Sequence, residues 1–118
     1  MSSLTSYRPY HVYTLRQALG PFSHVILITA LDFVNHHAQR VVTVLPLSFR
    51  DRAITTDTRV KIRCQGSGGY AQLSGDHFAA IDGVMAMERK YLILSSASEI
   101  HPLEEEEIKR KLGAYLGM

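Results

Sequence analysis

The amino-acid sequence predicts a small, mainly β domain (α+β) that ends in one amphipathic helix. Two observations support this prediction. Short runs of aromatic and β-branched residues recur along the chain, and turn residues such as Gly20-Pro21 separate them. After the last run, residues 102–115 repeat apolar side chains at helical spacing. Several short strands, tight turns and a terminal helix are typical of a small barrel or sandwich.

Five segments carry the pattern of a strand, namely 10–15, 24–29, 40–45, 59–64 and 91–94. Two more short strands are expected within 77–87, where Asp82-Gly83 marks a bend. The strictest alternation is in 59–64, where apolar and basic residues take turns, so this strand should have a basic outer face. Pro46 is expected to end the strand 40–45, with a polar loop from 47 to 57. One or two helical turns are expected within 30–39.

The terminal helix has signals at both ends. Pro102 suits a first helical position, and Gly117 can supply the C-terminal cap. The acidic residues 104–107 precede the basic residues 109–111, which is the order that the helix dipole favours. We interpret the four glutamates as a solvated face. The expected apolar stripe consists of Ile108, Leu112, Tyr115 and Leu116.

Length and composition limit the classes of protein to consider. A chain of 118 residues fits a single domain over 1–118, and we expect residues 1–8 to be flexible. The net charge of +2 is too small to indicate nucleic-acid binding by itself. Cys64 is the only cysteine, and we interpret it as a buried strand residue in a reducing compartment. No segment has the length of a membrane span and none resembles a secretory signal, so we expect a cytoplasmic protein.

Common motifs for cofactors and metals are missing from the sequence. The glycines at 66, 68 and 69 do not lead from a strand into a helix, and no Cys/His cluster has zinc spacing. His36-His37 is not expected to form a metal pair, because adjacent side chains on a helix diverge. We therefore predict no metal and no cofactor.

Three smaller features are candidates for a site. Ser48 follows Pro46-Leu47 and stands close in sequence to Arg50 and Arg52. Such a cluster suits an anion, but by itself it favours a strand-to-loop transition with solvated arginines. Asp82 is a lone acid in an apolar run, either a turn former or a site carboxylate. His24 opens a buried strand, either as an edge residue or as a base.

The order of several segments resembles that of a known family. The segments are Arg8-Pro9-Tyr10-His11-Val12, Val25-Ile26-Leu27-Ile28, residues 41–48 (VVTVLPLS), residues 57–62 (DTRVKI), Ala80-Ile81-Asp82 and the end Tyr115-Leu116-Gly117. Together they resemble the MazF/PemK toxins of toxin–antitoxin pairs, whose superfamily also contains CcdB. The resemblance covers the chain from Arg8 to Met118.

The resemblance implies an SH3-like β-barrel with a C-terminal helix, usually dimeric and neutralised by an antitoxin peptide in a groove. It also implies a metal-independent, sequence-specific endoribonuclease acting on single-stranded RNA. In that reaction a ribose 2′-hydroxyl attacks its own phosphate, which requires a base, a proton donor and cationic or hydrogen-bonding help.

The chain departs from the family at several site positions. The Arg-Pro pair that opens the family's second strand is Ser23-His24 here, so its main catalytic arginine is missing. The family threonine is Ser48, and the acid remains as Asp82. The glutamine after the acid is Gly83, and an arginine found three places after the acid is Met85.

We therefore expect His24, Ser48 and Asp82 to be catalytic and Arg50 and Arg52 to bind substrate. His24, Arg50 or Arg52 would replace the missing arginine, since each is expected to lie close to Ser48. One alternative is a CcdB-like DNA gyrase poison, although that branch uses a Trp-Gly-Ile end and this chain has no Trp. Another alternative is a degenerate member that binds antitoxin or nucleic acid without cleaving it.

Overall fold

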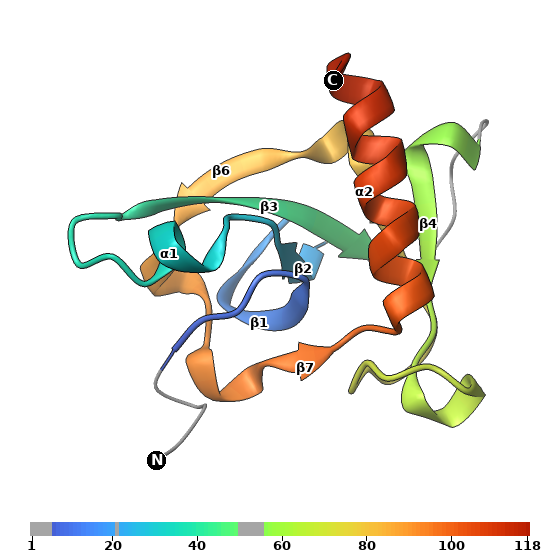
Figure 1. The fold of residues 1–118 in the computed structure, drawn as a ribbon. Coiled ribbons are helices and arrows are strands. Elements are labelled where there is room, and N and C mark those ends of the chain that lie inside the picture. The colour runs from blue at the N-terminus through green and yellow to red at the C-terminus, as the bar shows by residue number, and fades with distance from the viewer. Residues whose placement is uncertain (1–5, 21, 50–55) are drawn as a thin grey trace.

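In a computed structural model of the chain, residues 6–20, 22–49 and 56–118 are described. This part of the chain is mainly β, a curled antiparallel sheet crossed by a C-terminal helix (Figure 1). The strands are β1 His11–Leu19, β2 Phe22–Leu27, β3 Val41–Ser48, β4 Arg59–Ile62, β5 His77–Ala80, β6 Met85–Glu88 and β7 Ser98–Glu99. The helices are α1 Leu31–Val34 and α2 Pro102–Leu116. The predicted fold class is confirmed.

The sheet is organised around β3. The strand order is β4-β5-β3-β2-β1-β7, and β6 pairs with β3 along the same edge as β5. Successive side chains of a strand point to opposite faces, so the sheet carries a separate core on each face. The core under α2 includes Ile26, Leu45 and Ile108. The core on the other face includes Tyr13, Val25 and Val44.

Pro46 lies inside β3, so the prediction that it ends the strand is wrong. The strand continues to Ser48, and Pro46 is itself buried opposite Val25 of β2. The reason is local. Along its other edge, β3 pairs with β6 at residues 41–44 and with β5 at residues 47–48. Pro46 falls in the interval between these two ladders, where a missing N–H group disrupts no pairing.

The segment 91–94 is not a strand, contrary to the prediction. It runs from the last residue of the 3-10 turn η5 Arg89–Tyr91 to the first residue of η6 Leu94–Ser96, and Leu92 makes a single bridge to Leu15. The run is apolar because Leu92 is fully buried in the core, and not because the segment pairs with a neighbouring strand along its length. The two-residue strand β7 that follows gave no sequence signal. The two short strands within 77–87 are confirmed, with the 3-10 turn η4 Ile81–Gly83 at the bend.

The side chains of His36 and His37 do not diverge. Their rings stack with centroids 4.7 Å apart. The expectation failed because α1 ends at Val34, so the two residues lie in a turn and not on a helix.

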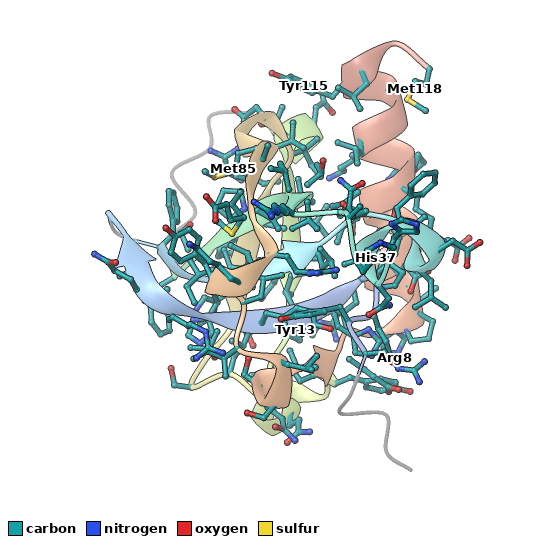
Figure 2. The ribbon with its side chains drawn as sticks, turned by 90° about the vertical axis from the view of Figure 1, so that its left-hand side faces the viewer. Arg8, Tyr13, His37, Met85, Tyr115 and Met118 are labelled. Atoms are coloured by element: carbon teal, nitrogen blue, oxygen red, sulfur yellow. The ribbon has the colours of Figure 1, made fainter. Side chains whose placement is uncertain are left out.

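Helix α2 begins and ends as predicted. Pro102 is in the first turn, and Gly117 adopts a left-handed conformation with φ 75° at the C-terminus. Ile108 and Leu112 are buried in the core. Tyr115 and Leu116 are about half exposed, so the expected stripe stops one turn early and the end of the helix presents apolar side chains to solvent (Figure 2).

Glu104 is buried, which corrects the view of the four glutamates as a solvated face. Its Oε1 accepts a hydrogen bond from the backbone N–H of His101, and its Oε2 accepts one from the N–H of Arg63, at 3.0 and 2.9 Å. Lys111 also donates to the carbonyl oxygen of Arg59, 2.8 Å away. Because β4 is an edge strand, these contacts let α2 cover backbone groups that would otherwise lack partners.

Within the described ranges, no helix is long and apolar enough to span a membrane. Cys64 is buried, as expected, but β4 ends two residues before it, so Cys64 is not a strand residue. Its thiol lies 3.7 Å from the Ser67 hydroxyl.

Replacing Glu104 should destabilise the fold. Glu104→Ala leaves two backbone N–H groups without their acceptor, so we expect a loss of about 1–3 kcal/mol in the free energy of unfolding. Glu106 is exposed on the same helix, and Glu106→Ala should cost less than about 0.5 kcal/mol. Urea denaturation of both variants measures the difference, and equal losses would contradict the role of Glu104.

Candidate functional site

Ser48 is the last residue of β3, at the end of the sheet where four strands lie side by side. Leu47 pairs with His24 of β2 on one side and with Ala79 of β5 on the other. Ser48 pairs with Phe78 of β5, which in turn pairs with Lys61 of β4. Ser48, Phe78 and Lys61 therefore form one row across three strands and share one face of the sheet.

The pairing register places His24 and Ser48 on opposite faces. Leu47 points into the core under α2, and His24 is its direct cross-strand partner, so both side chains lie on the α2 face. Ser48 and Ser23 each follow the alternation onto the other face. The expectation that His24 lies beside Ser48 is wrong. The position that carries the arginine in the MazF/PemK pattern, here Ser23, is the one on the Ser48 face.

His24 belongs to a small aromatic cluster with His77 and Phe49. The ring centroids are 5.6 Å apart for His24 and His77 and 4.1 Å apart for Phe49 and His77. The Nδ1 of His77 lies 2.8 Å from the carbonyl oxygen of Gly75, which can only accept, so Nδ1 carries the proton. Burial, with a smaller contribution from His77, lowers the pKa of His24 below its ordinary value.

Asp82 lies in the turn η4 and forms an ion pair with Arg59. The Oδ1 of Asp82 is 2.6 Å from Nη1 of Arg59. The turn packs closely on β3, since a Cβ atom at Gly83 would lie 3.0 Å from Cγ of Pro46 and 3.2 Å from Cβ of Ala80. Glycine at position 83 therefore avoids two tight contacts. Asp82 is thus both a turn residue and the partner of a charged side chain.

A second carboxylate, that of Asp76, lies next to Lys61 on this side of the sheet. Asp76 accepts hydrogen bonds from the Ser67 hydroxyl and from the backbone N–H of Cys64, and Lys61 lies 3.7 Å from it. These hydrogen bonds, that of Ser67 first, lower the pKa of Asp76 to about 2. Asp76 is therefore a fixed negative charge at neutral pH, and Lys61 is partly neutralised by it.

Arg50 and Arg52, the expected substrate-binding residues, lie outside the described residues. The cation that sequence reasoning missed is Arg59, which shares the Ser48 face because Val60 and Ile62 point into the α2 core. The strict alternation of residues 59–64 contained this information. It gave the face of Arg59 but not the strand order that places β4 two strands away from Ser48.

A separate basic cavity lies at the opposite end of β3. It has a volume of about 540 Å³ and is lined by Tyr7, Asn35, Arg40, Glu88, Arg89 and Lys90. Arg89 is fixed by hydrogen bonds to the carbonyl oxygens of Val34 and His36. The side-chain amide of Asn35 accepts a hydrogen bond from the backbone N–H of Tyr7 and donates one to its carbonyl oxygen. Arg40 is exposed, and Lys90 pairs with Glu88 at 3.2 Å.

Within the described ranges, no three His, Cys, Asp or Glu side chains are grouped so that they could hold a metal ion.

Comparison with solved structures identifies the fold. The chain superimposes on an endoribonuclease from a mycobacterial species with a TM-score of 0.69 and 18% sequence identity, over 99% of this chain and 97% of the other. It is also similar to an endoribonuclease in complex with its cognate antitoxin, from a mycobacterial species (TM-score 0.66, 19% identity, 96% and 95% covered). The chain has the fold of these endoribonucleases. No protein-family model and no curated protein matches the sequence.

The partly buried position of His24 should make stability depend on pH. Because the folded pKa is lowered, the unfolded chain binds more protons near and below pH 6.5, so the free energy of unfolding decreases as the pH falls from about 7 to 5. His24→Asn should flatten this dependence. His37 is exposed, and His37→Asn should leave the dependence unchanged. Urea denaturation at several pH values tests this, and identical slopes in His24→Asn and wild type would contradict it.

Proposed function

We propose that the chain is a toxin of the MazF/PemK type that cleaves single-stranded RNA and belongs to a type II toxin–antitoxin pair. One observation carries the proposal. The fold of two endoribonucleases covers nearly the whole of this chain, and the first four segments that resemble the family's motifs lie, in order, at β1, β2, β3 and β4. Ser48 and Ser23, which stand at the family's threonine and arginine positions, share one face of the sheet.

The proposed reaction needs no external reactant. The 2′-hydroxyl of one ribose loses its proton to a base and attacks the adjacent phosphorus, and the bond from phosphorus to the 5′-oxygen of the next nucleotide breaks. The 5′-oxygen takes up a proton, so the products are a 2′,3′-cyclic phosphate and a 5′-hydroxyl end. In this scheme Ser48 donates a hydrogen bond to a phosphate oxygen, and Arg50 and Arg52 bind the RNA backbone. His24, on the opposite face, takes no part.

The proposed partners follow from the same assignment. The neutralising partner is a cognate antitoxin peptide, and the chain acts in the cytoplasm as a homodimer. The apolar side chains at the end of α2, Tyr115, Leu116 and Met118, are exposed and provide surface for an association (Figure 2).

Induction in cells separates this function from its alternatives. We expect growth arrest with discrete RNA fragments and no gyrase-linked DNA breaks. Ser48→Ala should slow RNA cleavage about 100-fold, because one hydrogen-bond donor to the phosphate is removed. Ser95 is exposed on η6, and Ser95→Ala should cleave like wild type. DNA breaks would instead indicate a gyrase poison, and neither product would indicate a binding module.

The basic cavity should contribute to RNA affinity. Arg40 and Lys90 would contact phosphates, so Arg40→Ala and Lys90→Ala should each weaken binding of a non-cleavable oligonucleotide and lower the slope of log affinity against log salt by about 1. Arg110 is exposed on α2, and Arg110→Ala should leave that slope unchanged. Fluorescence anisotropy at several salt concentrations measures these values. Equal slopes in all variants would show that RNA does not reach this cavity.

A further inference from the structure

We infer that Arg59, held in place by Asp82, supplies the positive charge that the arginine at position 23 would otherwise bring to the scissile phosphate. This inference rests on the proposed ribonuclease function. It makes Arg59 a catalytic residue, because its guanidinium touches the reacting phosphate, and it makes Asp82 a positioning residue that acts through Arg59.

The pairing register brings Arg59 to the correct face. Arg59 pairs with Ala80 of β5, and Lys61, two residues on, pairs with Phe78, the partner of Ser48. Side chains two residues apart on a strand lie on the same face, so Arg59 and Ser48 both point away from α2. With β5 between β3 and β4, their Cα atoms are on the order of 12 Å apart. A phosphodiester fits between side chains of this length.

The side chains between Arg59 and β3 are small. Ala80 is the neighbour of Arg59 on β5, and Gly83 lies so close to Ala80 and Pro46 that a Cβ atom there would make tight contacts with both. The turn that carries Asp82 is therefore pressed against the end of β3. A bulkier residue at either position would separate Arg59 from Pro46-Leu47-Ser48. The chain departs from the family pattern at Ser23 and at Gly83. Both departures fit an arrangement in which Arg59 reaches the site from β4 in place of an arginine at position 23.

The guanidinium is oriented before any ligand binds. Its Nη1 lies 2.6 Å from Oδ1 of Asp82, 2.9 Å from the carbonyl oxygen of Thr58 and 3.2 Å from the Thr58 hydroxyl. These three hydrogen bonds all use Nη1. The Nε and Nη2 groups remain on the other edge of the planar fork, where they can donate to two phosphate oxygens.

The burial of Arg59 and Asp82 fits a pair with a functional role better than an ordinary surface ion pair. The Arg59 side chain is 21% exposed and that of Asp82 42% exposed, so the arginine is the more enclosed partner while remaining open to a ligand. Lys61, the other cation on this face, is 55% exposed and lies 3.7 Å from Asp76. Arg59 is thus the better ordered of the two cations near Ser48, and ordered charge is what stabilises a pentacoordinate phosphate without reorganisation.

Cleavage kinetics on an oligonucleotide that the wild type cuts test the inference. Arg59→Ala should lower kcat about 100- to 1,000-fold, and Arg59→Lys should recover part of the loss, because lysine keeps the charge but not the fork. Asp82→Asn should lower kcat about 10- to 100-fold with little change in KM, and Asp82→Glu should restore part of it. The control Arg110→Ala should cleave normally. If Arg59→Lys and Arg59→Ala fold and cleave like wild type, the assignment is wrong.

A second measurement does not depend on cleavage. Inorganic phosphate is titrated into protein labelled with nitrogen-15, and the Nε–H signal of Arg59 is followed by NMR. The signal should shift with saturation in wild type and broaden in Asp82→Asn, whereas the Arg110 signal should not move. If the wild type cleaves no RNA, the proposed function fails, yet a saturable shift still supports a phosphate site at Arg59. An unmoved Arg59 signal overturns the site.

Discussion

The structure depends on the pairing of β3 along both of its edges. β2 covers one edge, and β6 and then β5 cover the other, so β3 is the only described strand that pairs with three others. Its alternation assigns Leu45 and Leu47 to the core under α2 and Val42 and Val44 to the opposite core. A shift of one residue would send each set into the other core, where it would not fit the neighbouring side chains, and this fixes the register strongly.

The same register determines what the candidate site can be. It sends His24 into an aromatic cluster with His77 and Phe49, and it leaves Ser23, Ser48, Lys61 and Arg59 on the other face. Helix α2 adds to this constraint, because Lys111 binds the backbone of β4 at Arg59 and Glu104 binds the backbone of Arg63, the residue after β4. The strand that carries the proposed catalytic arginine is therefore anchored on its paired edge by β5 and on its free edge by α2.

Local patterns in the sequence predicted most of the fold. The alternation of 59–64, the apolar run in β2 and the cap residues of α2 each depend on neighbours in the chain, so they could be read directly. The site could be predicted only in part. The sequence singled out Ser48 and Asp82 as candidates, but the partner of Asp82 is 23 residues away. Pairing with Arg59, the burial of Glu104 and the place of Pro46 between two ladders all depend on strand order, which no local pattern specifies.

The measurement that tests the central claim most directly is cross-strand disulfide formation in a Cys64→Ala background. Opposed residues of a pair without mutual hydrogen bonds lie close enough for a disulfide. The pairing of His24 with Leu47 makes Ser23 and Ser48 the next opposed residues. The double variant Ser23→Cys/Ser48→Cys should therefore oxidise rapidly to an intramolecular disulfide, as shown by mass spectrometry and loss of free thiol. Rapid closure in His24→Cys/Ser48→Cys, with none in the first variant, would contradict the register and the site built on it.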